Sequence, residues 1–197
     1  MNLLICGDSF SYYNGDANSW VTKIHAEFNA TNLSSCGIGE YKIFQQLKSV
    51  DLNNYDKILI SHGSPNRLYI NQEHSLHTNK IYKNSDLLFA DVEIKKDKND
   101  LANAAYNYFL HIFDIEYYRY MHNLICADID NFSKSRSVIH ITHFDYTNLY
   151  QFDNTLIELY NTWIENKGTI NHYNVNGNNI VFNQLLKTLC NSNQTLI

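Results

Sequence analysis

The sequence has few of the residues that mark special architectures. Its 197 residues include one proline and seven glycines, and no internal repeat or domain linker is present. Only four cysteines occur, widely spaced and without a Cys-x-x-Cys pair: Cys6, Cys36, Cys126 and Cys190. This spacing argues against a disulfide framework and favours small core residues in a reducing compartment.

The sequence also lacks a basic surplus and a long apolar run. Fifteen Lys and Arg face 20 Asp and Glu, for a formal charge of −5. We therefore expect neither a nucleic acid nor an anionic membrane as partner. No apolar stretch approaches the roughly 18 residues that span a bilayer. The N-terminus shows no basic segment followed by an apolar one, so we expect a cytoplasmic protein.

Apolar runs and helical periodicity alternate along the chain. Hydrophobic residues make up 44% and charged residues 18%, as in a globular domain with one sizeable core. Strands are predicted at 3–6, 31–35, 55–61 and 137–142, and helices at 19–28, 41–50, 101–132, 149–164 and 180–189. The alternation predicts an α/β fold: a single three-layer α/β/α domain, residues 1–197, with a mostly parallel sheet and an irregular insertion at about 71–100.

Polar residues follow the predicted strands, at the edge where parallel sheets bind ligands. Ser9 comes directly after the first strand, in the segment Gly-Asp-Ser-Phe-Ser. A serine at such a turn can attack a carbonyl, with nearby backbone N–H groups stabilising the oxyanion. The nucleophile needs a base, and His172, just before the last helix, has the ordinary imidazole pKa that suits this role.

The order and spacing of these motifs resemble the SGNH/GDSL hydrolases, flavodoxin-like serine esterases, over nearly the whole chain. Residues 7–11 are similar to the family's first block, with Ser9 as nucleophile. Residues 32–37 resemble the second block, which implies that Gly37 offers a backbone N–H to the oxyanion. The last block is similar to His-x-Asn-x-x-Gly-Asn, matched by His172, Asn174, Gly177 and Asn178.

Two positions depart from the family's pattern. Pro65 stands where the third block places its oxyanion-hole asparagine, so Asn66 or the hydroxyl of Ser64 is expected to substitute. Thr169 stands three residues before His172, where the family usually has the aspartate that orients the imidazole. Either Ser9 and His172 act as a dyad, with another orienting group such as Glu165 or Asp145, or the site is eroded. Loss of the orienting carboxylate can cost about 10⁴ in turnover.

Simpler interpretations exist for the same residues. Gly-Asp-Ser can be a turn, and His172 can be a polar residue flanking a helix. His140 and His143 are poor chelators because their spacing places them on opposite faces of a strand. His74 and His77 lack cysteine or carboxylate ligands at suitable spacing, apart from Glu73. We therefore predict no metal site and no cofactor. No G-x-S-x-G elbow or P-loop is present.

The resemblance implies hydrolysis of a carboxylic ester through an acyl-enzyme on Ser9, with Ser9, Gly37 and Asn66 forming the oxyanion hole. The expected substrate is a small-molecule or carbohydrate ester with a small acyl group such as acetyl. Two alternatives stay open, a catalytically weak or inactive binding module and an O-acyltransferase. The sequence predicts no oligomeric state.

Overall fold

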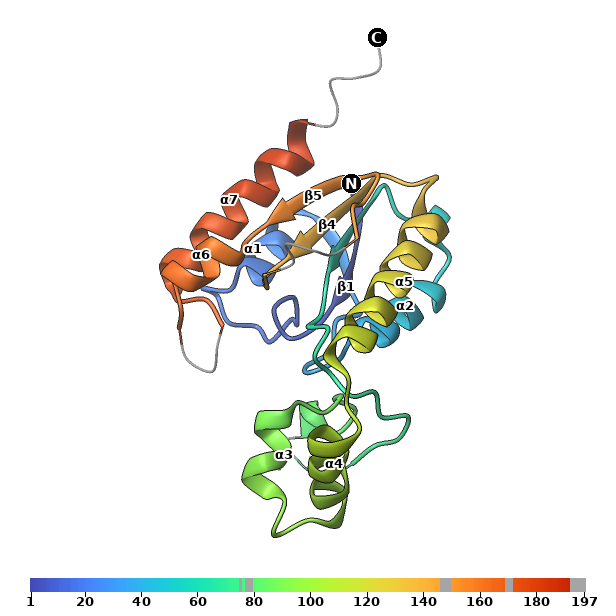
Figure 1. Ribbon diagram of the computed structural model, residues 1–197. Helices are drawn as coiled ribbons and strands as arrows, with labels where there is room; N and C mark the ends of the chain where they lie inside the picture. The colour runs from blue at the N-terminus through green and yellow to red at the C-terminus, as the bar shows by residue number, and fades with distance from the viewer. Residues whose placement is uncertain (75, 77–79, 146–149, 169–171, 192–197) are drawn as a thin grey trace.

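Five short strands form one parallel sheet in the computed structural model, and three of them, β1, β3 and β4, are mostly apolar runs (Figure 1). The structure describes residues 1–197 except 75, 77–79, 146–149, 169–171 and 192–197. The strands are β1 (Asn2–Gly7), β2 (Asn29–Asn32), β3 (Lys57–Ser61), β4 (Val138–Thr142) and β5 (Thr155–Glu158), in the order β2-β1-β3-β4-β5. All four neighbouring pairs are parallel, as predicted.

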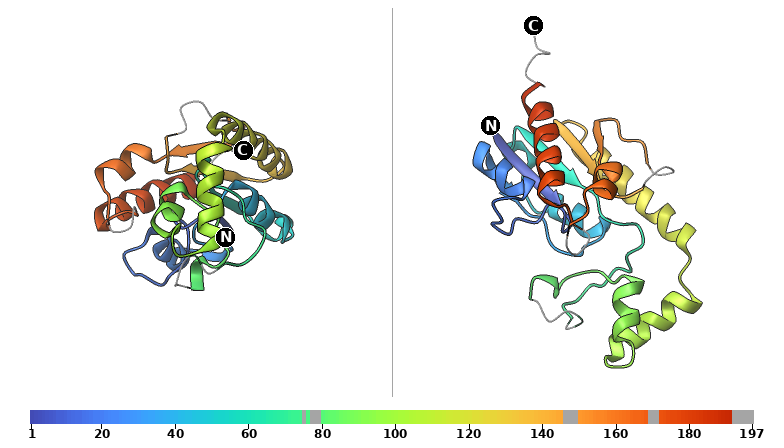
Figure 2. Two further views of the ribbon diagram at one scale, coloured as in Figure 1. Left: turned by 60° about the horizontal axis from the view of Figure 1, so that its bottom comes forward. Right: turned by 90° about the vertical axis from the view of Figure 1, so that its left-hand side faces the viewer.

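Helices cover both faces of the sheet and complete three layers (Figures 1 and 2). Alternate residues of β1 enter different cores: Leu3 and Ile5 pack on one face, Leu4 and Cys6 on the other. The first face is covered by α1 (Trp20–Glu27) and α7 (Val175–Asn191), and the second by α2 (Glu40–Lys48) and α5 (Ile115–Ser133). The predicted α/β/α architecture is therefore confirmed.

The helical segment predicted at 101–132 is divided in the structure. It forms α4 (Asp100–His111) and α5, separated at Ile112, whose backbone leaves the helical region. The carboxylate of Asp114 accepts hydrogen bonds from the N–H groups of Glu116 and Tyr117 and so starts the second helix. Aromatic residues recur at helical spacing through both helices, so the sequence pattern did not indicate where one helix ends and the next begins.

The helix predicted over 149–164 is wrong for its larger part. Residues 155–158 form the edge strand β5, and the helix α6 (Tyr160–Glu165) begins only afterwards. An edge strand buries few side chains, and only Ile157 of β5 is buried. It therefore carries no apolar run to reveal it. At the C-terminus, α7 begins at Val175, five residues before the predicted start.

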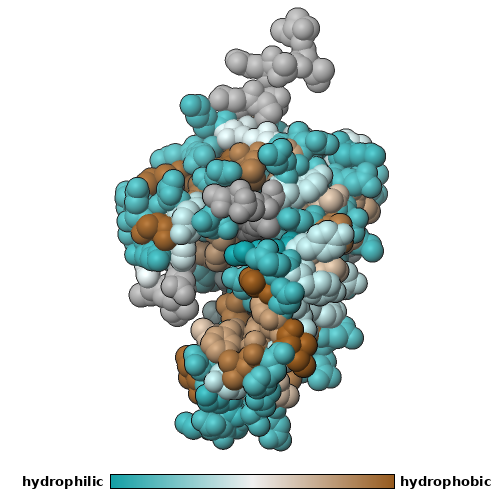
Figure 3. Space-filling model, in the orientation of Figure 1, coloured by the Kyte–Doolittle hydropathy of each residue, from teal (hydrophilic) through white to brown (hydrophobic). Residues whose placement is uncertain are grey.

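The predicted insertion contributes to a small lobe beside the carboxyl edge of the sheet (Figure 1). The short helices η2 (Lys80–Tyr82) and α3 (Phe89–Lys95) lie in it, and α3 packs on α4. This lobe has its own apolar cluster, formed by Leu76, Leu87, Val92, Ala102 and Ala105. Apolar side chains also reach its surface (Figure 3). One further short helix, η1 (Leu52–Asn54), precedes β3.

Within the described ranges, no helix has both the length and the apolar character that a membrane crossing requires. The four cysteines are free.

Candidate functional site

Ser9 lies in the turn that follows β1, and its side chain is half-buried. The turn is fixed by its neighbour Asp8, which is fully buried. The Asp8 carboxylate accepts a hydrogen bond from the N–H of Phe10 at 3.0 Å, and its carbonyl accepts one from the N–H of Ser11 at 3.2 Å. Burial raises the pKa of Asp8 to about 7, against the opposing charge of Arg67. The local sequence therefore presents Ser9 on a rigid loop.

His172 lies in the segment before α7, as the sequence predicts. Its carbonyl accepts a hydrogen bond from the N–H of Gly168 at 2.6 Å. Its imidazole packs edge-on against the ring of Phe10, with 5.1 Å between the ring centroids. Burial lowers the pKa of His172 below the ordinary histidine value. The imidazole is thus held in the neutral form that can accept a proton.

The other residues of the histidine block position α7. The side-chain oxygen of Asn174 accepts a hydrogen bond from the N–H of Gly177 at 2.9 Å. The side-chain oxygen of Asn178 accepts one from the N–H of Trp20 at 3.0 Å, which joins α7 to α1. These contacts are structural, and they fix the helix that follows His172.

Phe10 brings the predicted nucleophile and the predicted base to one side of the sheet edge. It follows Ser9 directly, and its ring contacts His172. Between these two described residues no hydrogen bond is formed. Thr169 lies outside the described residues, while Glu165 and Asp145 are exposed. The catalytic pairing of Ser9 with His172 therefore stays a prediction.

Gly37 follows β2 and Asn66 follows β3, the two strands that flank β1. Gly37 adopts a left-handed backbone with φ of +74°, and its carbonyl accepts hydrogen bonds from Arg67 and from the N–H of Asp86, both at 2.9 Å. Asn66 is exposed in the turn after β3, and its N–H donates to the hydroxyl of Ser64 at 3.3 Å. Their role as oxyanion-hole donors also stays a prediction.

A buried group of ionisable residues lies under the same edge. Glu40 is the first residue of α2 and is only 4% exposed. Its Oε1 lies 2.7 Å from Nδ1 of His62, and its Oε2 lies 3.3 Å from Nε2 of His122. The N–H of Gly63 donates to Oε2 at 3.1 Å. Burial alone would raise the pKa of Glu40, but the two histidines hold it well below its usual range.

The network continues from His62 towards α5. His62 Nε2 lies 2.9 Å from Nδ1 of His140, whose Nε2 is 3.7 Å from Oδ1 of Asp130. The ring of Phe152 stacks on both imidazoles, with centroid distances of 4.6 Å and 3.9 Å. Burial, helped by His62, lowers the pKa of His140 to about 2. His140 is therefore neutral at physiological pH.

His143 lies on the opposite side of the sheet from His140 and supports the Ser9 loop. Its Nε2 is 3.0 Å from the hydroxyl of Ser61, and its Nδ1 is 2.8 Å from that of Tyr173. Phe10 stacks on its ring with a centroid distance of 4.4 Å and an interplanar angle of 10°. Burial, followed by the nearby His172, lowers its pKa to about 3. A neutral imidazole can donate through one nitrogen and accept through the other.

Sequence reasoning missed the group around Glu40 because its members are distant along the chain. The only available signal was the position of His62 and His140 in or after buried strands. Of the other histidine pair considered above, His77 lies outside the described residues, and His74 lies 2.8 Å from the carbonyl of Ser85 through its Nε2.

A cavity of about 500 Å³ opens between α2, α5 and the segment after β3. Its wall is largely apolar, with the side chains of Phe44, Tyr118 and Ile125 among those that line it. Glu40 and His122 reach the same cavity from the buried network. The cavity therefore joins an apolar wall to a polar, ionisable end.

Comparison with known proteins identifies no family. No protein-family model matches the chain, and no curated protein does. A solved structure that it resembles is a possible lipase from Chitinophaga pinensis DSM 2588, with a TM-score of 0.31 and 10% identity. The match covers 71% of this chain but only 47% of that protein. At this level the likeness carries no argument about activity. The fold and the site define the chain as a parallel-sheet α/β domain with a serine and a histidine at the carboxyl edge.

Proposed function

We propose that the protein is an SGNH/GDSL-type serine hydrolase that cleaves a carboxylic ester through an acyl-enzyme on Ser9. The observation that carries this proposal is the placement of Ser9 and His172 around Phe10, at the carboxyl edge of the sheet. Ligands of open parallel sheets bind at that edge. The site thus offers a hydroxyl nucleophile and a base within one loop cluster.

The lowered pKa of His172 supports its assignment as the base. A neutral imidazole can take the proton of the Ser9 hydroxyl as the oxygen attacks the ester carbonyl. The imidazolium then gives this proton to the leaving alcohol, and the acyl group stays on Ser9. In the second half of the reaction His172 takes a proton from water as the water oxygen attacks the acyl carbon. The bond to the Ser9 oxygen then breaks, the imidazolium returns the proton to Ser9, and the acid leaves.

The negative charge that develops on the carbonyl oxygen during the attack must be stabilised by hydrogen-bond donors. We assign this role to the backbone N–H groups of Ser9 and Gly37, with Asn66 or the hydroxyl of Ser64 as the third donor. Support comes from the sheet order, because β1 lies between β2 and β3. The loops after these three strands, which carry the donors, therefore start at the same edge.

The substrate in this proposal is a small-molecule or carbohydrate ester with a small acyl group, such as an O-acetyl group. A cytoplasmic location belongs to the same proposal. An O-acyltransferase would use the same acyl-enzyme, and an acceptor alcohol that outcompetes water would identify that activity.

The test is labelling with a fluorophosphonate probe, read by intact mass. The parent protein should gain one adduct, and Ser9→Ala should gain none. Ser49→Ala, which removes an exposed hydroxyl at the end of α2, is the matched control and should still be labelled. Loss of labelling in His172→Ala would identify the base. An unlabelled parent, or a labelled Ser9→Ala, would overturn the proposal in favour of a non-catalytic binding module.

A further inference from the structure

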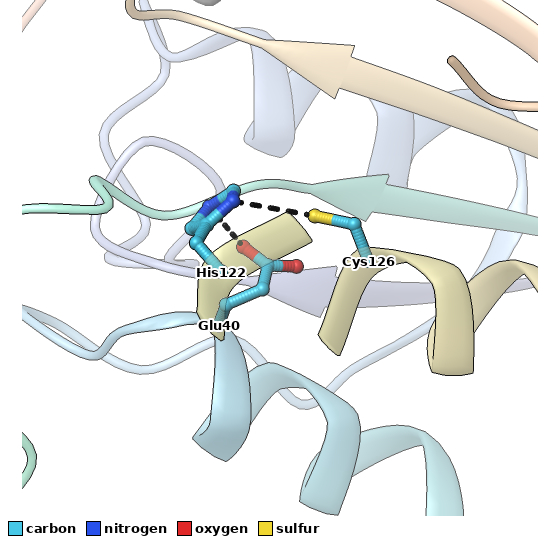
Figure 4. A group of neighbouring side chains, drawn as sticks. All are labelled: Glu40, His122 and Cys126. Carbon is cyan, nitrogen blue, oxygen red and sulfur yellow. Dashed lines mark hydrogen bonds and ion pairs between the residues drawn. The ribbon is translucent and has the colours of Figure 1, made fainter. Parts of the chain in front are cut away.

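Three side chains that can ligate a metal converge between α2 and α5 (Figure 4). His122 and Cys126 lie one turn apart on α5, and Glu40 faces them from the start of α2. All three are at most 4% exposed. One nitrogen of His122, the Cys126 sulfur and one Glu40 oxygen all lie within 4.8 Å of one another.

The separation of His122 and Cys126 suits a tetrahedral ion. Zinc is held by histidine nitrogen at about 2.0 Å and by thiolate sulfur at about 2.3 Å, so these two ligands of one tetrahedron lie roughly 3.5 Å apart. Nδ1 of His122 lies 3.4 Å from Sγ of Cys126. A four-residue spacing on a helix places both side chains on the same face. Helix α5 therefore supplies one edge of such a tetrahedron.

The surrounding groups orient the ligands as metal sites require. Nε2 of His122 lies 3.2 Å from the carbonyl of Gly63 and 3.3 Å from Oε2 of Glu40, so its N–H can donate there while Nδ1 faces Cys126. The Oε1 atom of Glu40 is held by His62. Ligands of zinc are commonly fixed by such outer hydrogen bonds.

We propose that Glu40, His122 and Cys126 bind a zinc ion, with the fourth position open to the cavity between α2 and α5. The cavity is lined by Glu40 and His122, so it offers a route for the ion and space for a water or another small ligand. Three protein ligands with one open position are typical of zinc sites that act on a bound molecule.

Charge balance agrees with a cation at this place. Glu40 brings a carboxylate to the group, and Cys126 becomes a thiolate when it binds a metal. An incoming zinc ion replaces the thiol proton: the S–H bond breaks, a Zn–S bond forms and the proton leaves to solvent. The ion compensates the negative charge that remains.

The competing description is a metal-free network. In it the Cys126 thiol donates to Nδ1 of His122, and Nε2–H donates to the carbonyl of Gly63 and to Oε2 of Glu40. The two descriptions differ in a spectroscopic property, because only a thiolate bound to a metal gives a sulfur-to-metal charge-transfer band.

The experiment is a Co²⁺ titration of the untagged, chelator-treated full-length chain, followed by absorption. We expect a charge-transfer band in the near ultraviolet and strong visible bands of tetrahedral Co²⁺, saturating at one equivalent. One equivalent of Zn²⁺ should remove them. Cys126→Ser should lose the charge-transfer band, and His122→Gln should weaken Co²⁺ binding at least tenfold. Cys36→Ser, which alters a buried cysteine outside the cluster, is the matched control and should retain every band.

Absence of these bands in the parent, or their persistence in Cys126→Ser, would overturn the proposal. If Cys126→Ser does not fold, the parent alone decides: Zn²⁺ but not Mg²⁺ should raise its Tm and protect Cys126 from alkylation, as mapped by peptide mass. Lack of both effects rejects the site. The zinc proposal is independent of the esterase proposal, because Ser9→Ala should bind Co²⁺ as the parent does.

Discussion

Oε1 of Glu40 lies at hydrogen-bond distance, 2.7 Å, from Nδ1 of His62, and both side chains are buried. The pair joins the start of α2 to the residue that follows β3. A buried carboxylate is stable only when its charge is paired and its oxygens accept hydrogen bonds, and Glu40 meets both conditions through His62, His122 and Gly63. This pairing sets the polar layer under the candidate site, in which burial lowers the pKa of His140.

The buried histidines should make the protein unstable in acid. The folded pKa values of His140 and His143, about 2 and about 3, lie below the ordinary 6.5. Below pH 6.5 the unfolded chain therefore binds protons that the folded chain excludes. Stability is fully present above this pH and is lost as pH falls, by about 1.4 kcal/mol per pH unit for each histidine.

Urea unfolding between pH 7.5 and 5 measures this effect. His143→Gln should reduce the slope of unfolding free energy against pH by about 1.4 kcal/mol per unit. His111→Gln, at an exposed position, should leave the slope unchanged. An equal slope in the parent and in His143→Gln would show that His143 is not neutral in the folded protein.

Asp8 should act in the opposite direction. Its folded pKa of about 7 lies above the ordinary 3.8, so the folded chain keeps a proton that the unfolded chain releases. The stabilisation that Asp8 adds to the free energy of unfolding is fully present below about pH 3.8 and is lost as pH rises to 7. Asp8→Asn removes this contribution, which opposes that of the histidines. The slope of the free energy of unfolding against pH should therefore steepen by about 1.4 kcal/mol per unit between pH 5 and 6.5. Asp97→Asn is the exposed control. A shallower slope in Asp8→Asn would contradict the assignment.

Asp86 should anchor the lobe to the sheet edge. Its buried carboxylate accepts the N–H groups of Gly39 at 2.7 Å and Ile70 at 3.0 Å, and it pairs with Lys42 at 2.8 Å. Asp86→Asn leaves buried donors unpaired and should cost about 2–4 kcal/mol in urea unfolding. Glu73→Gln, which breaks an exposed ion pair in the same segment, should cost at most about 1 kcal/mol. Similar costs for the two variants would show that Asp86 carries no anchoring role.

A side chain at position 37 should lower the free energy of unfolding. Both Gly37 and Gly15 have a left-handed backbone, with φ of +74° and +76°. A Cβ at Gly37 would lie 2.7 Å from Cβ of Ser85, whereas one at Gly15 would meet nothing within 4 Å. Gly15→Ala should therefore cost only the backbone strain, about 1–2 kcal/mol. Gly37→Ala should cost a further 1–3 kcal/mol, roughly, because the lobe must move. Urea unfolding of both variants isolates the contact, and equal losses would disprove it.

If His172 is the base, the pH profile of ester hydrolysis should reflect its lowered pKa. The acid limb of kcat/KM for a soluble acetyl ester should fall below pH 6.5, because only neutral imidazole accepts the serine proton. Measurement from pH 4.5 to 8 locates this limb, with His111→Gln as a control of unchanged profile. A limb above pH 6.5 would assign the titration to another group.

The sequence determined the sheet and the polar residues along its carboxyl edge. Apolar runs at 3–6, 55–61 and 137–142 predicted strands where β1, β3 and β4 lie, because strands buried on both faces consist largely of apolar residues. The positions of Ser9 and His172 after a strand and before a helix followed from the same patterns. The edge strand β5 escaped prediction, since only one of its residues is buried.

Only the tertiary structure decided which polar residues meet. Glu40 lies on α2, whereas His122 and Cys126 lie on α5. Along the chain these two helices are separated by β3, α3 and α4, so no local pattern links residues 40 and 122. The stacking of Phe10 on His143, and with it the support of the Ser9 loop, also depends on packing between the segments that follow β1 and β4, which spacing cannot encode. Periodicity reports burial along one segment, whereas pairing across segments depends on how the layers pack, and that is fixed only when the whole core forms.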